Sequence, residues 1–246
     1  MSADILFVGD PHGRFDGLLD VAAQHRPQAM ILLGDLEPRT SLLDWIGTVR
    51  DIGVEVWFIH GNHDTDSVAT WQRVVDANAW NLHGRVVEIA GVRTAGLGGV
   101  FRKSVWDPSA DQEPSMASLA DLERHLTQGG RARAGTGAQQ LRRHGSTIFP
   151  DDVARLARLR ADILVTHEAP LPHRHGFQAL NDLARAMGAK RLFHGHHHAY
   201  VDYTDRAAEM GFKAWGVASG DVVDRDGHEI LGGLSVSARR ACLTRF

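Results

Sequence analysis

The most informative stretch of the sequence is His194-Gly195-His196-His197-His198. It follows the short apolar run 191–193 and contains a glycine, which is typical of a strand that ends in a loop. Alternate side chains of an extended segment share a face, so His196 and His198 are expected together, with His197 opposite. Imidazole binds Zn, Fe, Mn, Ni or Co, but two histidines do not fill a coordination shell. The remaining ligands must therefore come from other parts of the chain.

Four other polar clusters each follow an apolar, β-like run, as expected for a site at the ends of strands in an α/β sheet. They are Asp10 and His12 after residues 4–9, Asp35 after 28–33, Asn62 to Asp64 after 54–59, and His167 after 162–166. Apolar residues at helical spacing follow the first three runs, at 16–25, 41–51 and 68–80. Three strand–helix units in succession favour a parallel sheet with right-handed crossovers, and so one assembled metal centre.

Taken alone, two of these clusters are more typical of an ordinary structural role than of a metal site. Asp10 is also a favoured N-cap for a helix that begins near Phe15, and Gly34-Asp35 is a common turn sequence. Residues 62–64 are more specific, because three polar groups in succession at the end of a strand are costly to bury unless something binds them. We assign His60 to a structural role.

Length and composition indicate one domain, spanning residues 1–246, because 43% hydrophobic residues suffice for one sizeable core. The formal net charge of -3 gives no general attraction to nucleic acid or to anionic membranes. The single cysteine, Cys242, excludes an internal disulfide and indicates a reducing compartment. Residues 1–10 are not typical of a signal peptide, and no apolar run approaches the ~20 residues of a membrane span, so we expect a cytoplasmic enzyme.

The composition changes over residues 101–149, which we interpret as an insertion or lid. Prolines, serines and glycines mix there with basic residues, and residues 115–127 could form one helix. The basic residues are Arg102, Lys103, Arg124, Arg131, Arg133, Arg142 and Arg143. The run GGRARAGTG at 129–137 is typical of a flexible segment. Two interpretations stay open, a solvated insertion or a basic lid that gathers an anionic substrate.

The remaining segments carry weaker signals. Runs at 86–89 and 92–100 predict paired strands, and 214–217 together with 230–231 predict closing strands of a second sheet. Helices are expected at 153–159 and 177–187. Glu168 lies either beside the site or on the surface, and His173 and His175 either touch substrate or are exposed loop histidines.

The five polar blocks resemble the calcineurin-like metallophosphoesterases, whose signature is D-x-H, GD, GNH followed by D or E, a lone H, and G-H-x-H, in that order. All five are present between residues 4 and 198, as Asp10-Pro11-His12, Gly34-Asp35, Gly61-Asn62-His63-Asp64, His167 and Gly195-His196-His197-His198. The resemblance implies an α/β fold in which a two-sheet β-sandwich is flanked by helices. Its last motif selects His196 and His198 rather than His194.

The resemblance also implies a dinuclear centre. One ion would be held by Asp10, His12, Asp35 and His198, and the second by Asp35, Asn62, His167 and His196, with Asp35 shared. Manganese is favoured, with iron or zinc as alternatives. We expect a metal-bridging hydroxide to attack phosphorus in line, with the two ions roughly 3.5–4 Å apart. His63 is the expected general acid that protonates the leaving group, and Asp64 is expected to orient its ring.

The substrate is less well defined by the sequence. The first motif and Arg39, four residues past Asp35, are similar to the branch that acts on phosphoproteins or dinucleoside polyphosphates, but Pro38 stands where that branch usually has Asp. The blocks THEAP and GHHH are more similar to bacterial phosphodiesterases and small-molecule phosphatases. We therefore expect a phosphorylated small molecule or a phosphodiester, with Arg39 and Arg102 as candidate substrate-binding residues and the choice between monoester and diester open.

Two other classes of function fit the sequence less well. Relatives that serve as metal-free scaffolds lose ligands, whereas all seven ligand positions and His63 are present here. A nuclease is disfavoured by the net negative charge and by the lack of an aromatic and basic stripe. The oligomeric state cannot be read from the sequence.

Overall fold

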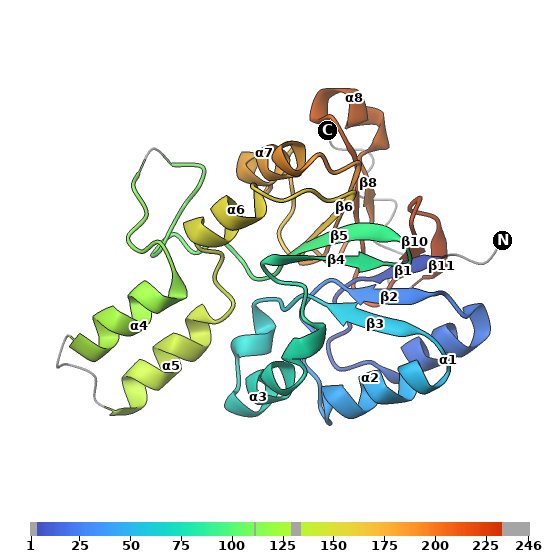
Figure 1. Ribbon diagram of the computed structural model, residues 1–246, viewed down its shortest axis with the longest axis horizontal. Helices are drawn as coiled ribbons and strands as arrows, with labels where there is room; N and C mark the ends of the chain where they lie inside the picture. The colour runs from blue at the N-terminus through green and yellow to red at the C-terminus, as the bar shows by residue number, and fades with distance from the viewer. Residues whose placement is uncertain (1–3, 111, 129–133, 233–246) are drawn as a thin grey trace.

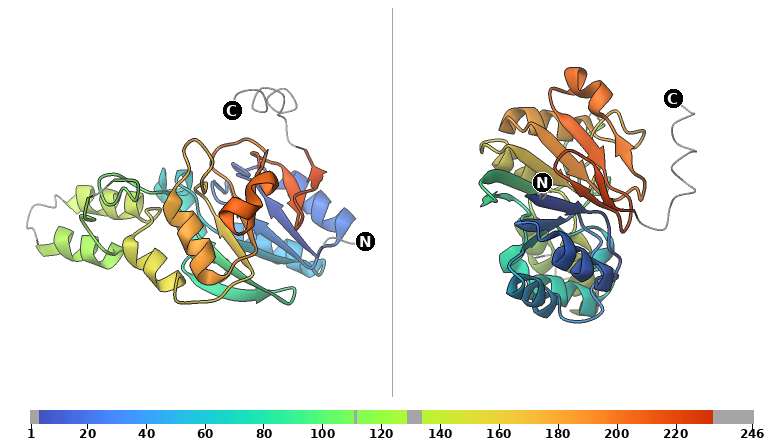
Figure 2. Two further views of the ribbon diagram at one scale, coloured as in Figure 1. Left: turned by 90° about the horizontal axis from the view of Figure 1, so that it is seen from above. Right: turned by 90° about the vertical axis from the view of Figure 1, so that its right-hand side faces the viewer.

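Two β-sheets packed face to face form the centre of the molecule, and helices cover both outer faces (Figures 1 and 2). The computed structural model describes residues 4–110, 112–128 and 134–232. The expectation of an α/β fold with a two-sheet sandwich flanked by helices is confirmed. Cys242, on which the expected reducing compartment depends, lies outside the described residues.

The first sheet has the strand order β11-β10-β1-β2-β3. Its parallel strands are β1 (Ile5–Val8), β2 (Ala29–Leu32) and β3 (Glu55–Phe58), joined by helices α1 (Asp16–His25) and α2 (Leu42–Asp51). β10 (Val222–Asp224) and β11 (Glu229–Leu231) extend it by antiparallel pairing. The prediction that 230–231 closes the second sheet is therefore wrong, because β11 pairs with β10 at the edge of the first.

The second sheet has the order β4-β5-β6-β7-β9-β8. β5 (Val92–Leu97), β6 (Ile163–Thr166), β7 (Arg191–His194) and β9 (Lys213–Gly216) are parallel. β4 (Arg85–Ile89) and β8 (Val201–Asp202) pair antiparallel at its two edges. The helices α6 (Pro150–Leu156), α7 (Gln178–Met187) and α8 (Ala207–Met210) belong to this half of the chain.

The core between the sheets is built by alternation along the strands. Side chains at odd positions of β1, such as Phe7, face the second sheet, whereas Leu6 and Val8 pack under α1 and α2. The ring of Phe7 stacks on Phe193 of β7 with centroids 3.7 Å apart, and Phe193 stacks in turn on Trp215. Each such fully buried apolar side chain contributes roughly 1.5–3 kcal/mol relative to exposure, so this column of rings joins the two sheets firmly.

The segment after β3 departs from one predicted helix. α3 (Val68–Asp76) is capped by Ser67, whose hydroxyl accepts a hydrogen bond from the backbone N–H of Thr70 at 3.0 Å. It is shorter than the predicted helix 68–80, because a separate 3-10 turn, η2 (Asn78–Trp80), follows. Another 3-10 turn, η1 (His63–Thr65), precedes it directly after β3.

The predicted insertion contains a helical hairpin that projects away from the sandwich (Figure 1). Its helices are α4 (Leu119–Gln128) and α5 (Ala134–His144), and α5 lies against η1. Of the segment 129–137, which the sequence predicts to be flexible, residues 134–137 begin α5, whereas 129–133 lie outside the described residues. Within the described ranges, none of the helices has the length and apolar character that crossing a membrane requires.

Candidate metal centre

The predicted ligands lie in loops at the carboxyl ends of parallel strands from both sheets. The loops after β1, β2 and β3 come from the first sheet, and those after β6 and β7 come from the second. Because parallel strands end at the same edge, the stacked sheets bring these loops together at one end of the sandwich. The structure thus brings together all seven residues that the sequence singled out, although their role as ligands remains a prediction.

The loops adopt backbone conformations that L-residues rarely take. Positive φ values occur at five of the seven predicted ligands, which are Asp10 (29°), His12 (46°), Asp35 (47°), His196 (70°) and His198 (53°). Such conformations cost energy outside glycine and concentrate at functional sites. His196 and His198 therefore do not lie in an extended segment, and the turn, rather than strand alternation, directs them to their places.

One group of ligand atoms comprises His12, Asp35 and His198, which all lie within 4.8 Å of one another. The Nε2 atoms of His12 and His198 are 3.0 Å apart, and Nε2 of His198 is 3.7 Å from Oδ2 of Asp10. Nδ1 of His12 donates a hydrogen bond to Glu37 at 2.7 Å. This bond leaves Nε2 free to face the group, which is how metal-binding histidines are oriented.

A second group comprises Asp35, His167 and His196, within the same 4.8 Å limit. Nε2 of His167 lies 3.4 Å from Oδ2 of Asp35 and 3.2 Å from Oδ1 of Asn62. Nδ1 of His167 donates to the backbone carbonyl of Leu33 at 2.8 Å, so Nε2 points at the group. The two groups share Asp35, as the resemblance implies for a dinuclear centre, and the assignment of each ligand to an ion stays a prediction.

Buried carboxylate oxygens without hydrogen-bond partners show that this site fits cations. Both oxygens of Asp10, and Oδ2 of Asp35, are buried and have only long contacts with histidine nitrogens, at 3.7 Å from Nδ1 of His167, 3.7 Å from Nε2 of His198 and 3.4 Å from Nε2 of His167, respectively. A buried carboxylate left in this state is expensive, and a divalent ion removes the cost. Imidazole nitrogen together with carboxylate and amide oxygen suits Mn, Fe or Zn, so the residues present fit two such ions.

The ionisation of the site without ions follows from burial and from charge. Burial raises the pKa of Asp10 to about 7, although the nearby His167 opposes the shift. Burial would also raise the pKa of Asp35, but the charge of His167 and its hydrogen bond outweigh it and lower that pKa. The reciprocal attraction overcomes burial at His167 and raises its pKa. A proton on His167 and a cation beside Asp35 are thus alternative ways of neutralising the same carboxylate.

The ring of His63 is oriented by Asp66 and not by Asp64. Nδ1 of His63 donates to Oδ2 of Asp66 at 2.7 Å, and the ring is 46% exposed. The two oxygens of Asp64 accept the backbone N–H groups of Glu37 and Gly61, each at 2.8 Å. The expectation that Asp64 orients His63 is therefore wrong. Asp64 instead joins the loop after β2 to the loop after β3.

The exposed ring of His63 still has the electrostatics of a proton donor. Its backbone N–H donates to Oδ1 of Asp35 at 2.8 Å, which places the residue at the edge of the shared carboxylate. Burial would lower the pKa of His63, but the hydrogen bond to Asp66 outweighs it, helped by the charges of Asp35 and Glu37, and raises that pKa. The raised pKa favours the protonated form of the ring.

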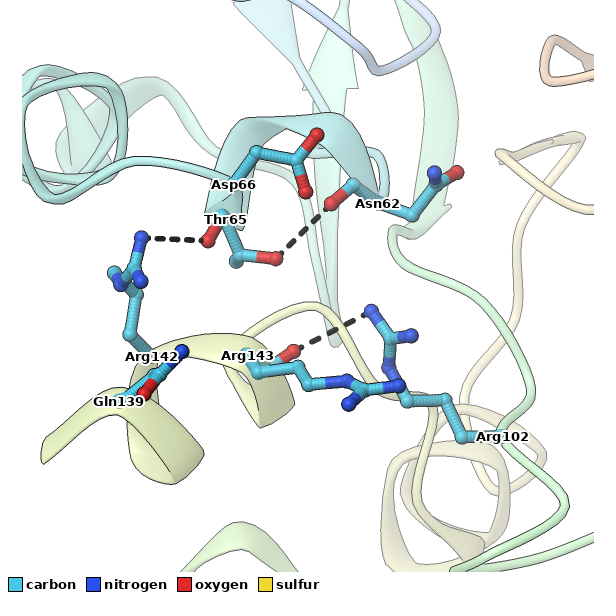
Figure 3. Close-up of a pocket in the computed structure, with 7 residues that line it drawn as sticks. All are labelled: Asn62, Thr65, Asp66, Arg102, Gln139, Arg142 and Arg143. Carbon is cyan, nitrogen blue, oxygen red and sulfur yellow. Dashed lines mark hydrogen bonds between the residues drawn. The ribbon is translucent and has the colours of Figure 1, made fainter. Parts of the chain in front are cut away.

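A cavity of about 300 Å³ opens beside the metal centre (Figure 3). It is lined by Asn62, Thr65, Asp66, Arg102, Gln139, Arg142 and Arg143. Of the two predicted substrate-binding residues, Arg102 lines this cavity. Arg39 does not belong to its lining and is exposed, with its side chain over Gly13.

Several residues around the site could not be singled out from the sequence. Glu37 and Asp66 hold ligand-loop histidines, yet each looks like an ordinary acidic loop residue in the sequence. Arg142 and Arg143 stand out in the sequence only as part of the basic composition of the insertion. No sequence pattern singles out Gln139.

A third group of potential ligand atoms shares His196 with the second group. Glu168, His196 and His197 form another group of potential ligands. Glu168 is buried, accepts the backbone N–H of Phe101 at 3.2 Å, and lies 3.9 Å from His196. His173 stacks on His197 with centroids 4.0 Å apart, so it packs against the histidine loop. Glu168 thus lies beside the site, the first of its two predicted positions.

Comparisons with known proteins agree with this geometry. A family profile described as calcineurin-like phosphoesterase matches residues 3–200. An uncharacterized protein of Haemophilus influenzae is 39% identical over 231 residues, which cover 92% of this chain and 96% of that protein.

Solved structures share the fold at low sequence identity. A protein of Thermus thermophilus has a TM-score of 0.56 at 14% identity, covering 95% of this chain and 99% of that chain. A dimetal phosphatase from Danio rerio has a TM-score of 0.51 at 14% identity, covering 90% and 93% respectively. At such identities the likeness concerns the fold alone.

Proposed function

This chain belongs to the calcineurin-like phosphoesterase family, and from that premise we propose that it is a phosphoester hydrolase that depends on two divalent cations. The observation that carries the proposal is the position of Asp35 between two groups of ligand atoms. A buried carboxylate shared in this way, whose Oδ2 has only a long contact of 3.4 Å with Nε2 of His167, is suited to a pair of cations.

The ligands would divide between two ions. The first would be held by Asp10, His12, Asp35 and His198, and the second by Asp35, Asn62, His167 and His196. When bound, the two cations acidify water and offset the negative charge on phosphoryl oxygens. We favour manganese, with iron or zinc as alternatives, because the ligands mix imidazole with oxygen donors.

His63 is the proposed general acid. Its ring is exposed, lies beside Asn62 in the sequence, and donates to Asp66, a residue of the cavity wall. A substrate oxygen that leaves phosphorus at this edge needs a proton, and the hydrogen bond to Asp66, which raises the pKa of His63, favours a ring that can supply it. Asp66 keeps the ring oriented, and its charge favours the protonated form.

The proposed substrates are phosphorylated small molecules or small phosphodiesters. The cavity beside Asn62 has room for part of a small molecule, and Arg102 supplies a positive charge at its wall. A dimetal phosphatase among the proteins of similar fold is consistent with phosphoester chemistry, although its substrate does not transfer to this chain.

The test uses p-nitrophenyl phosphate and bis-p-nitrophenyl phosphate as a monoester and a diester. Purified protein is stripped with a chelator, dialysed, and reloaded separately with Mn, Fe or Zn. We expect no turnover by the stripped protein and turnover after reloading, and the ratio of the two rates assigns monoesterase or diesterase. Asp35→Asn, purified in parallel, controls for contaminating phosphatases. Turnover of neither compound with any of the ions would overturn the proposal.

A further inference from the structure

The cavity beside the metal centre has two walls of different chemistry (Figure 3). Asn62, Thr65 and Asp66 form the wall on the side of η1, next to the predicted ligands. The opposite wall comes from the insertion, and it consists of Arg102 together with Gln139, Arg142 and Arg143 of α5. A group that enters the cavity therefore contacts the metal-ligand loop and the insertion at once.

Arg102 is held rigidly at this wall. Its Nε donates to Oγ1 of Thr147 at 3.1 Å, and its Nη2 donates to Oγ of Ser146 at 3.2 Å and to the backbone carbonyl of Arg143 at 3.4 Å. Its Nη1 takes part in none of these bonds. A planar guanidinium fixed in this manner is pre-organised to meet an anion.

Arg142 anchors the insertion to the metal-ligand loop. Its Nη1 donates to the backbone carbonyl of Thr65 at 3.0 Å. The hydroxyl of Thr65 is 2.8 Å from that of Ser146 and donates to the backbone carbonyl of Asn62 at 3.0 Å. These hydrogen bonds, through Thr65, fix the position of Arg142 relative to Asn62.

Arg143 is exposed, and its side chain extends toward the guanidinium of Arg102 in Figure 3. Burial lowers the pKa of Arg102, and the like charge of Arg143 lowers it further. Two guanidinium groups that approach each other at a cavity wall repel, unless an anion lies between them.

The charges of the cavity do not balance. Three guanidinium groups and one carboxylate, Asp66, line the cavity, and that carboxylate already accepts a hydrogen bond from His63. Glu168, which lies outside the lining, is the other carboxylate whose charge acts on Arg102. The excess positive charge lies inside a chain whose formal net charge is -3, so it is a local feature. Phosphate matches the fork of a guanidinium and accepts several hydrogen bonds at once.

We propose that the arginine cavity, defined by Arg102, Arg142 and Arg143, binds a second phosphate group of the substrate. The inference rests on the proposed function, since it assumes that a first phosphate reacts beside Asn62. The substrate class is then a small molecule with two phosphate groups, one at the metal centre and one at the insertion. A substrate with a single phosphate leaves the arginine cavity unfilled and binds less tightly.

The first test measures binding without catalysis. Inorganic pyrophosphate is titrated into metal-stripped protein in a calorimeter, and its dissociation constant is compared among the native chain, Arg143→Gln and Arg124→Gln. Arg124 belongs to the same hairpin but pairs with Asp121 and is absent from the cavity lining, so its variant is the matched control. We expect Arg143→Gln to weaken binding roughly tenfold or more, as for a lost hydrogen bond to a charged group, and Arg124→Gln to leave it unchanged. Arg143→Lys should recover part of the loss.

The second test measures discrimination by the metal-loaded protein. The substrates are propanediol, butanediol and pentanediol bisphosphates, each compared with its alkyl monophosphate. We expect a higher kcat/KM for at least one bisphosphate, and we expect Arg143→Gln to reduce that ratio while Arg124→Gln retains it.

The outcomes separate the inference from the proposed function. Equal kcat/KM for every bisphosphate and monophosphate would overturn the arginine cavity as a phosphate subsite and leave the hydrolase standing. Equal pyrophosphate affinity in the native chain and Arg143→Gln would do the same. Absence of turnover with any phosphoester would refute the hydrolase, and the calorimetry would still decide whether the cavity binds phosphate.

Discussion

Nδ1 of His63 lies 2.7 Å from Oδ2 of Asp66, three residues along the chain. The pair exists because η1 turns the backbone through a 3-10 helix, in which residues three apart face the same side. Asp64, although adjacent to His63, points into the interior and accepts backbone N–H groups. The position of two aspartates around one histidine therefore decides which carboxylate orients the ring and which one joins the loops after β2 and β3.

We predict that His63→Ala lowers kcat by roughly 100-fold to 10,000-fold with a leaving group that needs protonation. The side chain is not among the predicted ligands, so the metal content should stay the same. Elemental analysis of purified variants checks the content, and steady-state kinetics with an alkyl phosphate checks the rate. Loss of metal together with the rate would contradict the role given to His63.

Replacing the partner of the ring should have a smaller effect. Asp66→Asn keeps the size of the side chain but removes the charge that orients and stabilises the protonated ring, so kcat should fall about tenfold. The matched variant is Asp76→Asn, which changes an acidic residue at the end of α3, away from the site. An unchanged kcat in Asp66→Asn would show that the hydrogen bond is not used in turnover.

Asp64→Asn should lower the free energy of unfolding. The amide oxygen can still accept one backbone N–H, but the second loses its acceptor, and the loops that carry Glu37 and Gly61 lose a charged tie. A loss of about 1–3 kcal/mol in the free energy of unfolding is expected, since a buried donor is left unpaired. Denaturant titration measures it. A stable variant with kcat reduced as in His63→Ala would instead restore a catalytic role.

Asp35 is the ligand that both groups share, so Asp35→Asn should lose both ions. His12→Ala should retain the ion of the second group, because His12 belongs only to the first. Elemental analysis after dialysis is expected to give two ions per chain for the native protein, about one for His12→Ala and none for Asp35→Asn. Equal loss in both variants would mean that the two sites do not fill separately.

Asp152 of α6, which is not one of the predicted ligands, should make the stability of the fold depend on pH. Burial would raise the pKa of Asp152, but the interaction with His83, the backbone N–H of Phe149 and Arg155 lower it below its usual value. A carboxyl with a lowered folded-state pKa stabilises the fold above its unfolded pKa, and this contribution disappears as the pH falls through the folded-state pKa. Asp152→Asn should therefore cost about 1 kcal/mol at neutral pH, as for an acidic side chain in the first turn of a helix, and nothing in strong acid. Unfolding curves at both pH values test this, and an equal cost at both would refute the linkage.

Much of the site could be predicted from the sequence because it depends on local rules. Polar residues directly after apolar runs indicated strand ends, and the strand–helix alternation placed those ends at one edge. His167 needed only the strand before it and the resemblance to a known motif. For these residues the fold adds distances to an arrangement that the sequence already indicated.

Other features depend on contacts that no local pattern reveals. β11 joins the first sheet because β10 crosses back to pair with β1, which apolar residues at 230–231 do not indicate. The partner of His63 depends on a 3-10 turn of three residues, and the sequence favours neither Asp64 nor Asp66. Arg143, which is 41 residues from Arg102 in the chain, and Arg142 meet Arg102 only because α5 folds back onto η1.

Each proposed ion would take ligands from loops of both sheets, since His198 completes the first group and His167 and His196 the second. The stacked rings of Phe7 and Phe193 set the thickness of the sandwich only a few positions before Asp10 and His196, which lie in the loops that follow the same two strands. The proposed cation pair would therefore also cross-link the two halves of the molecule. We expect a substitution deep in the core that changes the spacing of the sheets to alter the fit of the ions without touching a ligand.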